Sequence, residues 1–302
     1  MKIKSLWIPF ALFLLVAVPL RVYQVVYLID PATGFFESGE SLYQIFLGIL
    51  ALFVLIIMIM TASCKNTSEF QFRRNIFSGV FALAAAAAMA ADSGANLLIY
   101  VVDHGTLRYL ILSICGVLGM IAFLVAAVSH FTGRNTFRKA PVLALLLPLW
   151  VCVRAVVLTF IEYTNVTTIS SNMLSVLSVL GMLMFLFSLS KLFTGIETPK
   201  TGKRTVMLGF LMVLFTLVAC VPQGVDAVQN GFSLTSSWTF LADLALVLYS
   251  LGLLVQASAQ LSRPQPFAQI SGEEQEEQTV GSSQEETVLM QVAADAINTL
   301  SI

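Results

Sequence analysis

Long apolar segments, separated by short polar links, fill the chain from residue 6 to about residue 261. A spanning helix needs roughly 20 mostly apolar residues to cross about 30 Å of hydrocarbon. The segments are continuously apolar and lack the period-two alternation of membrane strands, which favours helices over a barrel. The sequence therefore predicts eight transmembrane helices, at residues 6–28, 42–62, 76–102, 107–131, 141–161, 173–193, 206–232 and 238–261.

The composition indicates the same fold class. Of the 302 residues, 58% are hydrophobic and 11% are charged, whereas soluble domains average about 45–50% and about 25%. The prediction is an all-α polytopic membrane helix bundle whose partner is the lipid bilayer of the cell membrane. No nucleic-acid partner is expected.

Lysine and arginine are concentrated in every second link, and only Arg108 lies in the links between. Short basic loops favour the cytoplasmic side, so both termini are predicted to be cytoplasmic. The first segment begins with basic residues like a signal peptide. Because it is too long and lacks a small-residue cleavage site, we interpret it as a retained membrane anchor.

The two halves of the chain resemble one another. One constant offset matches three residues in and just before the third segment with residues of the same type around the seventh: Arg74 with Arg204, Gly79 with Gly209 and Gly94 with Gly224. A duplicated four-helix unit is predicted, at residues 1–134 and 135–263, with the parallel relation found in some transporters. The alternative is a chance match between apolar helices with basic ends. The aligned glycines argue against chance, because glycine in a membrane helix marks close helix approach.

Charged residues occur inside the predicted spans. A rise of 1.5 Å per residue places Arg21, Asp92, Arg154 and Asp243 at a similar depth, in the outer third of the membrane. Such charges cost at least about 2.5 to 3.5 kcal/mol near the bilayer centre and usually face the bundle interior or a wet cavity. The predicted ligand-binding residues are these four and two amides of the same half: Arg21, Gln24, Asp92, Asn96, Arg154 and Asp243. For Arg154 we expect a buried pair with Asp92. Alternatively, the arginines snorkel to headgroups and the carboxylates only hold helices together.

Helix-breaking residues lie beside these charges. The third segment has a Ser93-Gly94 step after Asp92, and the seventh contains Pro222. Serine–glycine pairs and proline both kink helices. A broken helix in each half is therefore predicted, which in transporters often marks the binding site. The alternative is a proline kink with packing glycines and no ligand.

No catalytic or metal-binding motif is present. The four cysteines have no CxxC spacing and the chain has two histidines, so no metal site or disulfide framework is expected. HExxH, GxSxG, Walker and dinucleotide-binding motifs are absent from the sequence. We predict neither an enzyme nor a cofactor.

Residues 264–302 form a third region with a different composition. An acidic stretch too polar to fold follows Arg263. Ser283 and Glu286 fit a capping box, and apolar residues from Val288 to Leu300 recur at helical spacing. A short amphipathic helix is predicted, which would dock on the basic loops of the bundle or on a cytoplasmic protein. The alternative is a disordered tail.

The segment Tyr23-Gln24-Val25-Val26-Tyr27-Leu28-Ile29-Asp30, with Thr33-Gly34-Phe35-Phe36, resembles the start of uncharacterised multi-pass membrane proteins of clostridial bacteria. The resemblance implies a bacterial multi-pass protein and no particular activity.

We expect a protein that recognises a small polar or anionic compound through an outward-facing intramembrane pocket, as a transporter or sensor. The alternative is a non-catalytic membrane scaffold that recruits a partner through its cytoplasmic tail.

Overall fold

The computed structural model describes residues 3–29, 36, 40–64, 72–102, 104–157, 169–196, 201–230 and 234–261. These residues are mainly helical, with two short 3-10 helices, η1 (Ile3–Leu6) and η2 (Thr136–Arg138), and one isolated antiparallel bridge between Ile29 and Phe36. The α-helices are α1 (Trp7–Tyr27), α2 (Glu40–Ser63), α3 (Ile76–Val102), α4 (Leu107–Thr132), α5 (Pro141–Val157), α6 (Ile169–Thr194), α7 (Thr201–Asn230) and α8 (Leu234–Leu261). The acidic tail and its predicted amphipathic helix lie outside the described residues.

Seven of these helices are long and apolar enough to cross a membrane: α1, α2, α3, α4, α6, α7 and α8. The prediction of an all-α, multi-pass membrane bundle is confirmed. α5 is a shorter apolar helix of 17 residues. The rest of the predicted fifth span lies outside the described residues, so the eighth crossing stays a prediction.

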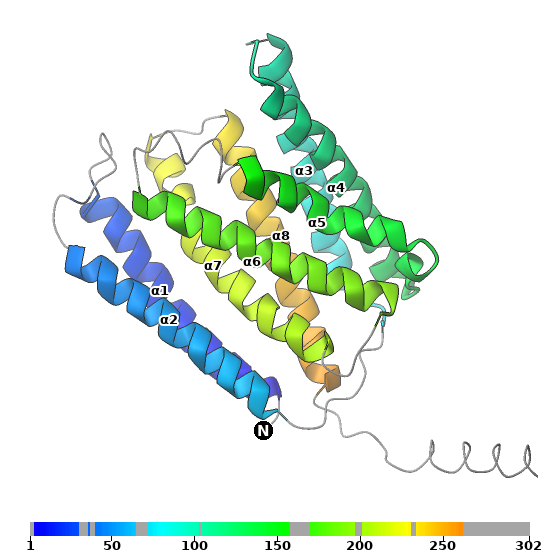
Figure 1. Ribbon diagram of the computed structural model, residues 1–302, viewed down its shortest axis with the longest axis horizontal. Helices are drawn as coiled ribbons and strands as arrows, with labels where there is room; N and C mark the ends of the chain where they lie inside the picture. The colour runs from blue at the N-terminus through cyan, green and yellow to red at the C-terminus, as the bar shows by residue number, and fades with distance from the viewer. Residues whose placement is uncertain are drawn as a thin grey trace, which may run out of the picture. The chain divides into compact units, whose positions relative to one another are not determined.

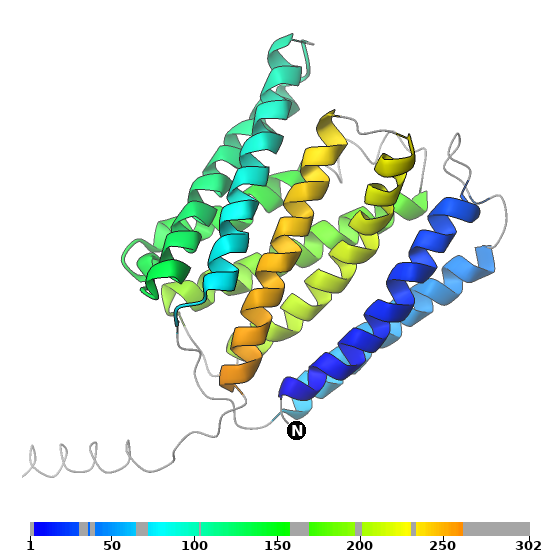
Figure 2. The same ribbon diagram turned by 180° about the vertical axis from the view of Figure 1, so that it is seen from behind.

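Six helices form a closed ring, in which each packs against two neighbours. The order around the ring is α3, α4, α5, α6, α7, α8 and back to α3, and the α1–α2 pair packs outside it against α7. Figures 1 and 2 show α5 and α6 on one face and α3 and α8 on the opposite face. α5 and α8 therefore lie across the ring from one another.

A glycine ends α4, and a proline begins α5. α4 ends at Gly133, whose φ of 70° is left-handed and whose N–H donates to the Ser129 carbonyl at 2.9 Å. Glycine adopts this conformation without the steric cost of a Cβ. Pro141 then begins α5, a position where its missing N–H leaves no helical hydrogen bond unmade.

The basic links gather at one end of the bundle, which we call the basic end. Lys203 Nζ donates to the Cys64 carbonyl, and Gln256 Nε2 donates to the Arg73 carbonyl at 3.2 Å. These bonds join the start of α7 to the end of α2, and the end of α8 to the chain before α3. Arg108 lies in the first turn of α4, at the opposite end of the bundle. The cytoplasmic placement of the basic end stays a prediction.

The structure corrects the expectation of broken helices. α3 runs without interruption through Ser93 and Gly94, and α7 runs through Pro222. Proline removes one backbone donor from a helix, and in a membrane the neighbouring helices help to tolerate it. The consequence of Pro222 is therefore local: the Val218 carbonyl loses its helical hydrogen-bond partner.

The duplicated four-helix unit stays a prediction. A methyl group at Gly79 would lie 2.8 Å from Phe131 of α4, and one at Gly209 would lie 2.7 Å from Leu254 of α8. These matching contacts agree with a duplicated unit. Gly94, however, has no neighbouring atom within 4 Å of that position, so it does not mark a close approach. The helix neighbours also differ, because α1 and α2 pack on α7 while α5 and α6 lie between α4 and α7.

Candidate functional site

Arg154 of α5 and Asp243 of α8 form a bidentate ion pair inside the ring. Nη1 lies 2.5 Å from Oδ1 and Nη2 lies 2.9 Å from Oδ2. The side chains are 18% and 7% exposed, respectively. Because α5 and α8 face one another across the ring, the arginine side chain spans its interior. Parallel donation from both Nη atoms is the strongest geometry available to a guanidinium and a carboxylate.

Trp150 holds Arg154 in this direction. The two residues are one helical turn apart on α5, and the guanidinium lies over the indole, 5.4 Å from its centroid. Trp150 is buried against α4, where a methyl group at Gly119 would be 3.2 Å from its Cβ. Gly116 makes a similar close approach to Ser93 of α3. Small residues on α4 thus allow α3 and α5 to pack closely enough for their polar groups to meet.

Asp92 of α3 joins the pair to form what we call the charge cluster: Asp92, Arg154 and Asp243. Its Oδ1 accepts a hydrogen bond from Thr239 Oγ1 of α8 at 2.7 Å, and its Oδ2 accepts one from Asn96 Nδ2 at 3.4 Å. It lies within electrostatic range of both Arg154 and Asp243. The ion-pair partner of Arg154 is thus Asp243 and not Asp92 as expected, because α8 carries Asp243 to the guanidinium. Two carboxylates therefore face one guanidinium, and three helices are connected through them.

Arg21 and Gln24 of α1 form a separate polar centre between α1, α2 and α7. Arg21 is 2% exposed, and its Nη1 donates to Gln24 Oε1 at 3.2 Å. Gln24 Nε2 donates in turn to the Leu42 carbonyl of α2 at 3.1 Å. The arginine is buried between helices and does not extend into lipid. The sequence prediction grouped these two residues with the charge cluster, and the structure places them at another helix interface.

A cavity of about 120 Å³ adjoins Arg21 and is lined on its other sides by α6 and α7. Leu174 of α6 and Val218, Pro222 and Gln223 of α7 contribute to its wall. We call it the Arg21 cavity. Within the described part of the chain, Arg21 has no carboxylate at ion-pair distance. The buried Arg21 guanidinium thus faces the Arg21 cavity, and Val218 contributes to the wall of the same cavity. The Val218 carbonyl has no helical N–H partner, because Pro222 has no N–H.

Sequence reasoning missed two supporting residues. Thr239 precedes Asp243, and Trp150 precedes Arg154, by one helical turn each. Residues four apart share a helix face, so this spacing could have identified both. Cys220 of α7, one of the four cysteines, lies within electrostatic range of Asp243 and Arg154. That proximity depends on how α7 packs, and no spacing in the sequence indicates it.

Neither of the two cavities described for this protein is lined by the charge cluster. The charge cluster joins α3, α5 and α8 through its hydrogen bonds and ion pair, and the Arg21 cavity adjoins a buried guanidinium. Within the described residues, no group of three or more metal-ligating side chains is present.

Comparison with protein-family models, with curated proteins and with solved structures finds no match to this chain. The resemblance to clostridial membrane proteins accordingly stays a prediction.

Proposed function

We propose that this protein lies in the cell membrane and recognises a small anionic compound at the Arg21 cavity, as a transporter or sensor that is open to the outer side. The observation that carries the proposal is a guanidinium that is 98% buried, adjoins a cavity and has no carboxylate partner among the described residues. An isolated cation inside a membrane is costly unless it is paired or hydrated. A bound anion would remove that cost.

The chemistry of the cavity limits the ligand to a small one. A guanidinium carries five N–H donors in a planar fork that suits carboxylate and similar oxyanions. The volume of about 120 Å³ accommodates several waters or an anion with a few heavy atoms. Gln223 can supply a further amide donor from α7. Formate, acetate, nitrate and chloride are therefore suitable probes.

The charge cluster supports this function indirectly. It joins α3, α5 and α8 through Asp92, Arg154 and Asp243. Of these helices, α3 and α5 pack against α4, and α8 packs against α7. α7 supplies Pro222 and Gln223 to the cavity wall. A rigid ring beside a cavity is the kind of scaffold that preorganises a binding site.

The test is anion-dependent stability of the purified full-length chain in detergent. Unfolding is measured in increasing formate, acetate, nitrate or chloride, with ionic strength held constant by gluconate. A ligand at 100 times its Kd stabilises the protein by about 2.7 kcal/mol. We expect Arg21→Gln to abolish this gain. Arg108→Gln is the matched control, because Arg108 stacks on Tyr109, 4.7 Å from its ring centroid, and does not line the cavity.

Asp226→Asn addresses a rival explanation. Asp226 follows Pro222 by four residues and is the acidic residue of the α7 sequence, and its side chain lies outside the described part of the structure. The proposal requires that the wild type responds to a small anion and that Asp226→Asn keeps the response. If added anions stabilise Asp226→Asn but not the wild type, the Asp226 carboxylate is itself the anion that pairs with Arg21, and the proposal is wrong.

The runner-up is a non-catalytic scaffold that recruits a partner through its cytoplasmic tail. The closed, bidentate Arg154–Asp243 pair favours it, because a satisfied ion pair that lines neither described cavity is suited to holding helices together. Deleting residues from Gly272 onward separates the two proposals. Loss of a co-purifying protein with unchanged anion response would assign the tail to recruitment and leave the Arg21 proposal intact.

A further inference from the structure

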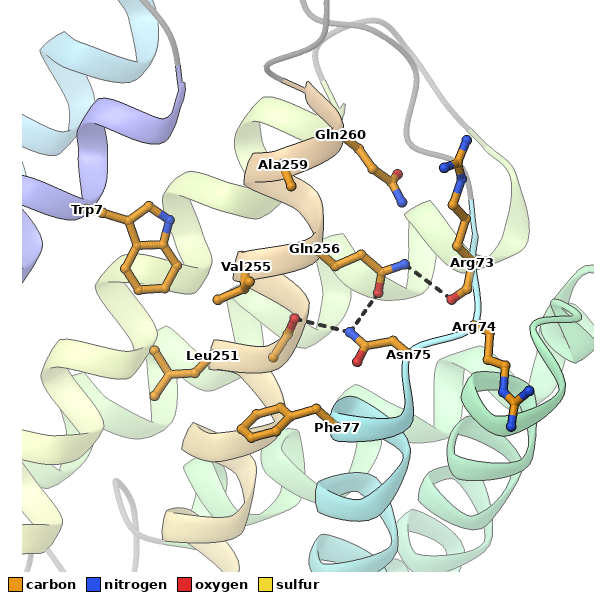
Figure 3. A pocket seen from close by; sticks show the side chains of 11 residues that line it. Trp7, Arg73, Arg74, Asn75, Phe77, Leu251, Val255, Gln256, Ala259 and Gln260 are labelled. Carbon is orange, nitrogen blue, oxygen red and sulfur yellow. Dashed lines mark hydrogen bonds between the residues drawn. The ribbon is translucent and has the colours of Figure 1, made fainter.

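The largest described cavity is a groove of about 710 Å³ at the basic end, on the outer face of α8. Figure 3 shows Trp7 on one side of α8 and Arg73, Arg74, Asn75 and Phe77 on the other side, so that α8 forms the floor. We call this site the α8 groove. It lies apart from the Arg21 cavity and from the charge cluster, and no lining residue is shared.

The mouth of the α8 groove is polar and is held by hydrogen bonds to α8. Asn75 Nδ2 donates to the Gln256 Oε1 at 2.9 Å and to the Gly252 carbonyl at 3.3 Å. Gln256 Nε2 donates to the Arg73 carbonyl at 3.2 Å (Figure 3). These bonds position the backbone of two consecutive arginines at the rim. Arg73 and Arg74 are both exposed. In Figure 3 the Arg73 side chain extends on the side of Gln260, and the Arg74 side chain extends in the opposite direction.

The remaining walls are apolar and exposed. Val255 is 57% exposed on the floor, and Phe77 is 51% exposed on one wall. Trp7 forms the other wall, where its Nε1 donates to Ser258 Oγ at 3.1 Å. From Gln260 at the mouth to Leu251 at the apolar end, α8 rises about 14 Å at 1.5 Å per residue. One leaflet of a bilayer with a core of about 30 Å has about the same depth.

We propose that the α8 groove binds a phospholipid with an anionic headgroup, taken from the leaflet at the basic end. The headgroup phosphate would lie at Arg73 beside the mouth, Arg74 would add positive charge at the same rim, and an acyl chain would lie along Val255 between Trp7 and Phe77. The charge at the mouth suits the headgroup phosphate. The apolar floor suits an acyl chain, and the groove has about the length of one leaflet. Basic pockets between helices on the cytoplasmic side are suited to anionic headgroups.

The test is native mass spectrometry of the full-length chain, released from micelles that contain equal amounts of phosphatidylglycerol and phosphatidylcholine. We expect a bound phosphatidylglycerol in clear excess. Each basic residue near the surface contributes about 1 kcal/mol, or about 5-fold, so Arg73→Gln/Arg74→Gln should reduce the preference by about 25-fold. Arg134→Gln/Lys139→Gln, two exposed basic residues of the same end outside the groove, should retain it.

Val255→Trp tests the apolar floor independently, because a large ring at an exposed position fills the groove with little effect on folding. It should reduce retention of both lipids, whereas Val128→Trp, at a similarly exposed site on α4, should not. The proposal would be overturned if Arg73→Gln/Arg74→Gln and the control Arg134→Gln/Lys139→Gln lost the preference for phosphatidylglycerol equally. A preference that arises only after deletion of residues 272–302 would also overturn it, since the chain's own tail would then occupy the groove.

Discussion

Arg154 Nη1 and Asp243 Oδ1 meet 2.5 Å apart at the centre of the helix ring, on two helices that do not follow one another around it. The pair thus connects opposite walls of the bundle. Loss of one partner would leave the other charge unpaired in a medium of low dielectric constant, which costs more than the interaction itself contributes.

A double-mutant cycle measures this coupling. Arg154→Met and Asp243→Ala should each destabilise the protein by about 3 to 5 kcal/mol, because each leaves a buried charge without its partner. The double variant should cost much less than the sum of the two single variants. The measurement is unfolding in mixed micelles with increasing sodium dodecyl sulfate. Additive effects would show that the two side chains do not depend on one another.

The two carboxylates of the charge cluster should respond differently to the same amide substitution. Asp243→Asn removes the charge that directly faces Arg154 and should cost about 3 kcal/mol or more. Asp92→Asn should change stability by less than about 1 kcal/mol, because its amide oxygen still accepts from Thr239 and one of two like charges is removed. The same unfolding assay compares them. An equal loss in both variants would contradict the assignment of Asp243 as the main partner.

Gly116 tests the close packing of α4 on α3. A methyl group there would overlap with Ser93 Oγ and lie 3.3 Å from Ser93 Cβ, so Gly116→Ala should destabilise the protein by about 1 to 3 kcal/mol. Gly94→Ala is the matched control on α3, because no atom lies within 4 Å of its added methyl group. Combining Gly116→Ala with Ser93→Ala should recover part of the loss. A neutral Gly116→Ala would mean that α3 and α4 are further apart than described.

Membrane orientation can be tested with single cysteines in a chain whose four native cysteines are replaced by alanine. Ile196 lies just after α6 at the basic end, and Thr106 lies just before α4 at the opposite end; both are exposed. An impermeant maleimide added to intact cells should label Thr106→Cys and spare Ile196→Cys until the membrane is opened, as the basic loops predict. The reverse pattern would invert the predicted topology.

The helices were predictable because membrane insertion requires long runs of apolar residues, and such runs are visible in the sequence alone. Seven of the eight predicted spans correspond to helices that can cross a membrane. Pro222 shows where local signals were insufficient: proline favours a break, yet α7 continues through it. The packing of its neighbours decides that outcome, and their contacts are not encoded in the residues beside Pro222.

The candidate site divides in the same way. Polar residues within an apolar segment are costly, so the sequence alone identified Arg21, Gln24, Asp92, Asn96, Arg154 and Asp243 as residues that need partners. Only the tertiary structure decided the partners, joining Arg154 to Asp243 across the ring and leaving Arg21 beside a cavity with Gln24. The depth of a residue in the membrane follows from counting residues along its helix. The ion-pair or hydrogen-bond partner of a residue depends on the rotation and order of the helices, which are set by packing between segments far apart in the chain.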